Sequence, residues 1–252
     1  MRKIISLAAV GILFSLPCAA QTLNIYCEDQ SQAKGPDGRF VGVDWDIVSE
    51  IQKRVGNSDK IQLVPWTRGL KYVESDPNTL LFSMARTKDR NLLYQWIGPI
   101  SETSYGFYVK SDSKIVINSL DDAKKVASIG VYRNDIRDQF LTQEGFTNLD
   151  RADNSFSNLK KLFAGRVAVI ASTAIAVKSE TRRTGHSAGD VKFLYAFLKL
   201  PIYIAASKKT DPKIVASWNA ALEGMKKDGT LRTILRKYST EQQNPGPDTT
   251  VY

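Results

Sequence analysis

The sequence predicts an α/β fold of two lobes, each a mostly parallel sheet flanked by helices, with two strands that cross between the lobes. Runs of β-favouring residues alternate with helical patterns along most of the chain, which is typical of parallel sheets. At 105–109 a strand without a preceding helix leads into a polar turn, after which the alternation starts again. A second apolar run, at 200–205, returns the chain to the first lobe, so the two crossings form a hinge.

The first lobe is predicted to open with a strand at 23–27. The helix that follows is capped by Asp44 and ends at Gly56, because aspartate accepts hydrogen bonds from the first amides of a helix and glycine suits its last turn. The next elements are a strand at 61–64, a helix at 66–73 and a strand that starts at Leu80.

The second lobe repeats this order of elements. Ser119 and Asp122 form a capping-box pattern, and Ser155 can cap a helix that ends at Gly165. The other predicted elements are a strand at 126–131, a helix at 135–141, a strand at 167–171, a helix at 175–184 and an extended segment at 193–197.

Two helices after the second crossing are expected to pack back on the first lobe. Asp211 caps the earlier helix, Pro212 takes its first position and Gly229 ends it, while the last helix begins at Thr230. The predicted units are residues 21–108 with 201–240 for the first lobe, 109–200 for the second lobe and 241–252 for a flexible tail.

Residues 1–20 have the pattern of a secretory signal, with a basic start, an apolar core at 4–16 and small residues up to Ala20, where we expect cleavage. The apolar core is shorter than the roughly 20 residues that span a membrane. We therefore expect a soluble, exported protein. Cys27 is then its sole cysteine, which excludes an intramolecular disulfide.

The composition argues against several classes of function. The formal charge is +9, and +7 without the two basic residues of the signal, but the basic residues are scattered and no aromatic-basic pattern typical of nucleic-acid binding occurs. The sequence has no metal-ligand spacing, no phosphate-binding glycine loop and no nucleophile elbow. The lone His186 lies in a glycine-containing loop without an adjacent nucleophile. We therefore predict no nucleic-acid partner, no metal, no cofactor and no catalytic residue.

The most informative segment is a buried strand at 80–84 that runs into a polar turn. Thr87 can cap the short helix after it, and Asp89 favours the positive end of that helix. This places Arg90 near the carboxyl end of the strand, where open α/β sheets bind ligands. A guanidinium matches a carboxylate in bidentate geometry, so the spacing predicts recognition of an anion by Arg90.

Ser83, Thr87 and Arg90 resemble the Ser-x-x-x-Thr-x-x-Arg segment of the bacterial extracellular solute-binding proteins, family 3, of the polar amino-acid type. Residues 37–46 are similar to the Gly-x-Asp-x-Asp opening of that family, and 228–231 to its closing pair of helices. The resemblance implies a type II periplasmic-binding-protein-like fold with the ligand between the lobes. It also implies that Arg90 holds the α-carboxylate of the ligand.

By position, the resemblance implies further ligand contacts in the first lobe. Glu28 falls where the family often places an acidic contact, and Trp66 where an aromatic ring forms a wall against the ligand side chain. Ser83 offers a hydroxyl and Ala85 main-chain groups at the strand end. Arg68 either reaches a second anionic group or is solvated.

In the second lobe, residues 130–137 resemble the Gly-Val-x-x-Gly-Thr segment of the family, whose amides at a helix start hold the carboxylate. From this segment we expect Tyr132, Asp135 and Ile136 to contact the ligand. Thr173 falls where the family places an acid against the α-ammonium, and it carries no charge. A carboxylate without an amine therefore stays open as the ligand.

The function expected from this resemblance is a periplasmic, monomeric solute-binding protein that captures a small polar carboxylate, most simply an amino acid, and delivers it to an ABC importer. One alternative is a ligand-sensing partner of a membrane receptor. Another is a cleft enzyme of the cyclohexadienyl-dehydratase type, in which Glu28 or Asp135 would donate a proton if burial raised its pKa. Arg86 either faces solvent or adds positive charge near the ligand, and the sequence leaves both open.

Overall fold

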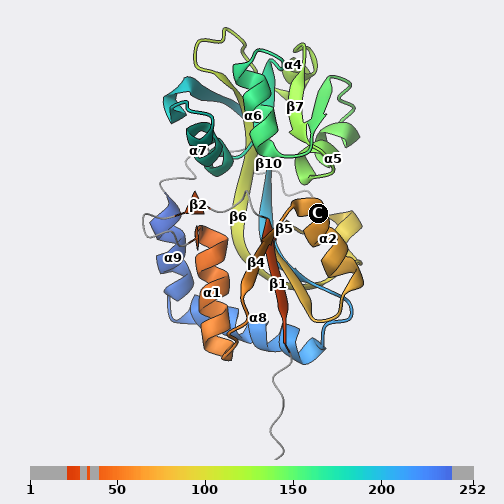
Figure 1. The fold of residues 1–252 in the computed structure, drawn as a ribbon, viewed down its shortest axis with the longest axis vertical. Helices are drawn as coiled ribbons and strands as arrows, with labels where there is room; N and C mark the ends of the chain where they lie inside the picture. Colours follow the sequence, from red (N-terminus) through yellow and green to blue (C-terminus); the bar gives the residue numbers. More distant parts are fainter. Residues whose placement is uncertain (1–21, 29–32, 35–39, 240–252) are drawn as a thin grey trace, which may run out of the picture.

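The structure, a computed structural model, describes residues 22–28, 33–34 and 40–239. The described residues form two lobes joined by a pair of long strands, one lobe above the other in Figure 1. This is the mixed α/β fold of type II periplasmic binding proteins, as predicted. The predicted signal and tail, and part of the Gly-x-Asp-x-Asp segment, lie outside the described residues. No described helix has both the length and the apolar character needed to cross a membrane.

The two long strands are β6 (Gln95–Lys110) and β10 (Val191–Ala206), which pair antiparallel along both lobes. The sequence predicted them as short separate pieces at 105–109, 193–197 and 200–205, and this was wrong in extent. Pro201 in β10 and the polar residues opposite it in β6 interrupt the apolar patterns of the two strands. The continuous ladder between the two strands holds both extended across that interruption.

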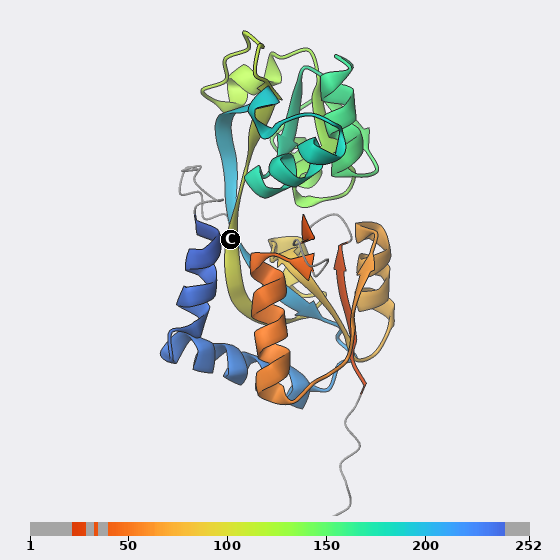
Figure 2. The same ribbon diagram turned by 60° about the vertical axis from the view of Figure 1, so that its left-hand side comes forward.

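The lower lobe in Figure 1 has the strand order β4-β1-β5-β10-β6, in which β1 pairs parallel with both β4 and β5. Helices α1, α8 and α9 cover one face of this sheet and α2 covers the other, as Figures 1 and 2 show together. Its elements are β1 (Asn24–Glu28), β2 (Ala33–Lys34), β3 (Phe40–Val41), α1 (Val43–Val55), β4 (Ile61–Val64), α2 (Trp66–Ser75), β5 (Thr79–Ala85), α3 (Lys88–Asn91), α8 (Pro212–Lys227) and α9 (Thr230–Ser239).

In the upper lobe, β7 pairs parallel with both β8 and β9, and β9 joins β6 antiparallel. The sequence pattern did not predict β8, nor the short antiparallel pair β2-β3 of the lower lobe. The elements are α4 (Leu120–Lys124), β7 (Ile129–Tyr132), α5 (Ile136–Gln143), β8 (Leu149–Ala152), α6 (Ser155–Phe163), β9 (Val169–Ser172), α7 (Ala174–Arg183) and a 3₁₀ turn at Ala188–Asp190. The lobe boundaries given above remain a prediction.

Helix caps show where the local signals were sufficient. Thr87 caps α3, and Asp211 caps α8 with Pro212 in the first turn, as predicted. The cap predicted at Asp44 was wrong, because α1 begins after Gly42 and the Asp44 carboxylate is bonded elsewhere. The cap predicted at Ser155 was wrong by one residue, since the neighbouring Asn154 accepts the hydrogen bond from the helix amide.

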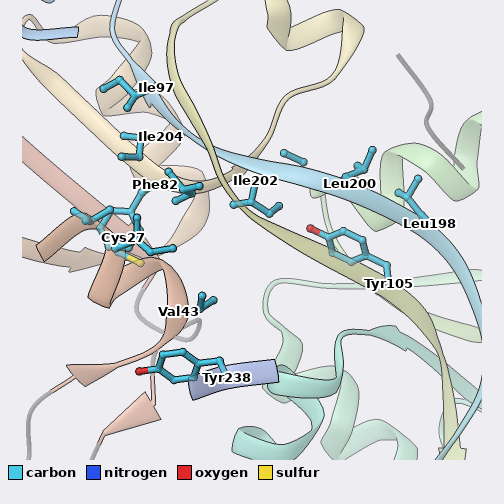
Figure 3. Close-up of a cluster of buried hydrophobic side chains, with 14 of the residues drawn as sticks. Cys27, Val43, Phe82, Ile97, Tyr105, Leu198, Leu200, Ile202, Ile204 and Tyr238 are labelled. Carbon is cyan, nitrogen blue, oxygen red and sulfur yellow. The ribbon is translucent and has the colours of Figure 1, made fainter. Parts of the chain in front are cut away.

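The main core continues from one lobe into the other along the long strands. Figure 3 shows buried side chains of the lower lobe, such as Phe82 and Ile97, followed along β10 and β6 by Leu200, Leu198 and Tyr105. All five belong to one cluster of buried residues. The hinge strands are therefore packed and not merely linkers, which restricts how the lobes can move.

Candidate ligand-binding site

Arg90 sits in α3, directly after the carboxyl end of β5. The Thr87 hydroxyl accepts a hydrogen bond from the Arg90 backbone N–H at 3.3 Å and so fixes the start of this short helix. The Arg90 side chain is only 6% exposed. Its Nη1 donates to the carbonyl oxygen of Ala85 at 3.3 Å, and no carboxylate among the described residues forms an ion pair with it.

Two buried donors at this place lack partners among the described residues. They are Nη2 of Arg90 and Nε1 of the Trp66 indole. The Arg90 guanidinium lies 5.6 Å from the centre of the Trp66 ring, and burial lowers the pKa of Arg90. A buried donor without an acceptor is costly, and a buried cation more so. The arrangement therefore suits an acceptor that carries negative charge.

Tyr132 brings the second lobe to this point. It ends β7, and its ring belongs to the same buried cluster as Trp66, which lies in the other lobe. The Tyr132 hydroxyl donates to the carboxylate of Glu28 at the end of β1, and burial followed by this contact raises the pKa of Tyr132. The carboxyl ends of parallel strands from the two lobes thus meet here, the usual location of a ligand site in such sheets.

Asp135 caps α5, and its carboxylate is fully engaged. Its Oδ1 accepts from the backbone N–H groups of Arg137 and Asp138 at 2.9 and 3.2 Å. Its Oδ2 forms an ion pair with the Arg137 guanidinium. Burial lowers the pKa of Arg137, but the contact with Asp135 outweighs this, so that the pKa is raised. The Arg137 and Asp138 amides near the start of α5 are therefore occupied by the chain's own carboxylate.

Tyr105 lies on the hinge strand β6 (Figure 3). It is 8% exposed, and burial raises the pKa of its hydroxyl. Arg137 and Asp135 of one lobe and Arg90 of the other all act electrostatically on it. Tyr105 therefore lies within electrostatic range of charged groups from both lobes.

Ser83 has a hydroxyl that is already used. Its Oγ donates to Asp44 Oδ2 at 2.7 Å, while Ser101 donates to Asp44 Oδ1 at 2.5 Å. Burial raises the pKa of Asp44, and the two hydroxyl contacts oppose this. Ser83 also has a positive φ of 63°, a conformation that is uncommon outside glycine. The network ties α1 and β5 to the hinge strand β6.

The remaining predicted contacts lie in varied surroundings. Thr173 caps α7, where its Oγ1 accepts from a backbone N–H at 3.2 Å. Ile136 is half-buried against the main core. Arg68 is exposed.

Arg86 lies against two aromatic rings. Its guanidinium is 5.6 Å from the ring centre of Trp96 and 5.6 Å from that of Tyr203, and it donates a hydrogen bond to Asn91.

Sequence reasoning missed three residues that the structure places in this region: Tyr105, Arg137 and Asp44 as an acceptor for serines. An Asp-x-Arg pattern across a helix start was a usable signal for Arg137, because the cap and the third residue lie on one side of the helix. Tyr105 reads as an ordinary strand residue, and the partners of Asp44 lie 39 and 57 positions away.

The described residues hold no group of three or more His, Cys, Asp or Glu side chains placed to bind a metal. His186 stacks on Phe163 with 3.7 Å between ring centres and contacts Asp190 at 3.4 Å, on the exposed end of α7. This arrangement fits a surface histidine. The groups at the lobe junction can bind and orient an anion.

Residues 29–241 match the family model of the bacterial extracellular solute-binding proteins, family 3. The match covers most of the chain. The chain belongs to this family. The family consists mainly of binding proteins, and some of its relatives are enzymes or sensors.

The sequence of the chain is only distantly similar to those of the individual proteins that it matches. The chain is 22% identical over 211 residues to the probable amino-acid-binding protein YxeM of Bacillus subtilis (strain 168), which covers 81% of this chain and 78% of that protein. Among solved structures, an ancestral arginine-binding protein bound to glutamine is 25% identical, with a TM-score of 0.74 over 86% of this chain and 97% of that one. A histidine kinase sensor domain with similarity to periplasmic binding proteins has a TM-score of 0.76 at 15% identity, over 86% of this chain and 96% of that one.

Proposed function

We propose that the protein binds an amino acid between its lobes in the periplasm, holds the α-carboxylate on Arg90 and delivers the ligand to an ABC importer. The observation that carries this proposal is the buried Arg90 guanidinium, whose Nη2 has no partner among the described residues. A bidentate carboxylate supplies the missing acceptor and the missing charge in one group. The membership in family 3 and the similarity to YxeM support the amino-acid class.

Closure of the lobes is the mechanism we propose for capture. The ligand contacts Arg90 and Trp66 of the lower lobe first, and the upper lobe then brings Tyr132 against them. The Tyr132 contact with Glu28 and its packing in the Trp66 cluster support closure at this place, because they join the lobes at the same point. A ligand that touches both lobes stabilises the closed state by its differential contacts.

Glu28 is our candidate for the counter-charge to an ammonium group. It lies at the end of β1 and accepts from Tyr132, whereas Asp135 has both oxygens engaged and Thr173 has no charge. An amino acid bound with its carboxylate on Arg90 and its ammonium toward Glu28 has both of its charges paired, which removes a cost of several kcal/mol per ion.

The test is a thermal-shift and calorimetry panel on the protein from Gln21 onward, with the twenty amino acids, dicarboxylates and prephenate-like acids. A ligand at 100 times its Kd adds about 2.7 kcal/mol of stability, which raises the Tm of a domain of this size by roughly 5–10 °C. We expect at least one amino acid to give such a shift. No shift with any amino acid, or product formation from a prephenate-like acid by mass spectrometry, contradicts the proposal.

A further inference from the structure

Two arginines lie at the junction of the lobes, and they differ in charge balance. Arg137 is 7% exposed and forms an ion pair with Asp135, and its Nη2 also donates to Ser155 at 3.3 Å. Arg90 is equally buried, and its Nη1 donates to the Ala85 carbonyl, whereas its Nη2 has no acceptor in the described part of the chain. One buried guanidinium is thus neutralised from within the protein and the other is not.

The two guanidiniums face one aromatic cluster from opposite lobes. Arg90 lies 5.6 Å from the Trp66 ring centre, and Arg137 lies 5.7 Å from that of Tyr132. Trp66 and Tyr132 belong to the same buried cluster. The hinge residue Tyr105 acts electrostatically on both arginines and on Asp135. A ligand held on Arg90 between the lobes therefore lies within the electrostatic reach of Arg137 and Asp135.

We infer that Asp135 sets the charge that the ligand can carry. It neutralises Arg137 and accepts from the Arg137 and Asp138 N–H groups near the start of α5, so that neither this guanidinium nor these two amides are free to hold an anion. Arg90 then accepts one carboxylate. The site takes an amino acid with a single carboxylate and rejects aspartate, glutamate and other dicarboxylates.

The physical reason is the cost of a second carboxylate at a buried place. Such a group would meet the Asp135 carboxylate instead of a free guanidinium, and like charges in a low dielectric repel strongly. Its own burial without a partner adds a desolvation cost. This inference rests on the proposed function, since it presupposes that Arg90 holds a carboxylate between the lobes.

The decisive variant is Asp135→Asn. Asparagine caps helices as well as aspartate does, so α5 keeps its start while Arg137 loses its counter-charge. In the wild-type protein, calorimetry should give aspartate and glutamate a Kd at least tenfold higher than that of the best neutral amino acid in the panel. In Asp135→Asn this gap should shrink at least tenfold, because the released Arg137 accepts the second carboxylate.

Asp138→Asn is the matched control. Asp138 is also buried near the start of α5, but its ion pair is with Arg151, whose side chain is 36% exposed. The same loss of charge there should leave the preference between acidic and neutral amino acids within threefold of the wild type. The double variant Asp135→Asn/Arg137→Met removes the released cation as well, and it should reject aspartate and glutamate more strongly than Asp135→Asn does, because a second carboxylate again lacks a partner there.

The outcomes separate a failure of the proposed function from a failure of the inference on Asp135. If the wild type binds no amino acid, the proposed function fails and this inference fails with it. If the wild type binds acidic and neutral amino acids equally, or if Asp135→Asn keeps the wild-type gap, only the inference on Asp135 is overturned. The inference on Asp135 is also overturned if Asp138→Asn narrows the difference in Kd between acidic and neutral amino acids as much as Asp135→Asn does. Should Asp135→Asn not fold, the wild-type preference still decides, because a Kd for aspartate or glutamate equal to that of the best neutral amino acid overturns the inference on Asp135.

Discussion

Replacing Arg90 by methionine should separate ligand affinity from stability. Methionine is long and unbranched and fills irregular buried space, so the variant removes the guanidinium with little loss of packing. The folded protein loses the 3.3 Å bond to the Ala85 carbonyl, worth about 1 kcal/mol or less, and the contact with the Trp66 ring, worth about 0.5–2 kcal/mol. It is also relieved of a buried cation without a counter-charge, which offsets losses of this size.

The cost to binding is larger. A bidentate carboxylate on Arg90 makes two hydrogen bonds to a charged group, each worth about 1.5–3 kcal/mol. Losing both costs about 3–6 kcal/mol, and at about 1.4 kcal/mol per factor of ten the Kd should rise roughly 100-fold to 10,000-fold. The unfolding free energy should stay within about 1–2 kcal/mol of the wild type, or rise.

Calorimetry with the best ligand gives the Kd, and urea denaturation without ligand gives the unfolding free energy. Arg151→Met is the control, because that arginine is half-exposed and paired with Asp138 away from Arg90, and its Kd should not change. A Kd of Arg90→Met within threefold of the wild type refutes the role of Arg90 in binding. A loss of more than about 3 kcal/mol of stability assigns Arg90 a structural role instead.

Three other variants test the surroundings of the site. Tyr132→Phe keeps the ring but loses the bond to Glu28; calorimetry should show a Kd about tenfold higher or more, and an unchanged Kd excludes this contact as part of closure. Asp44 has a native pKa raised by burial above its usual 3.8, so its contribution to stability is full below that pH and is lost as the pH rises through the native pKa. Asp44→Asn lacks this loss, and its unfolding free energy relative to the wild type should therefore increase between pH 4 and pH 7, whereas parallel pH curves contradict the reasoning. Trp218→Ala, at a side chain 1% exposed, should cost about 3–5 kcal/mol in urea denaturation and leave the Kd unchanged; a weaker affinity would tie this part of the core to the ligand.

Local signals in the sequence were enough to place Arg90. The buried strand, the Thr87 cap and the position of Arg90 three residues later depend on neighbouring residues, and the structure has all three. The Asp211 cap of α8, with its adjacent proline, follows from the same kind of signal. Such features depend on interactions within one turn of the chain, which a sequence displays directly.

The missed features depend on residues far apart in the chain. β6 and β10 stabilise each other along their whole length, and neither shows its full extent alone. Asp44 looks like a helix cap until the fold brings Ser83 and Ser101 to its carboxylate. Competing signals explain the rest, since Asn154 and Ser155 are adjacent and both suit a cap.

Binding of an amino-acid carboxylate by Arg90 between the lobes can be seen in a crystal structure of the protein with the best ligand from the panel. We expect the carboxylate oxygens to lie about 2.7–2.9 Å from Nη1 and Nη2 of Arg90, while Asp135 still caps α5. A carboxylate bound instead to the backbone N–H groups of Arg137 and Asp138, with the Asp135 side chain displaced, would contradict it.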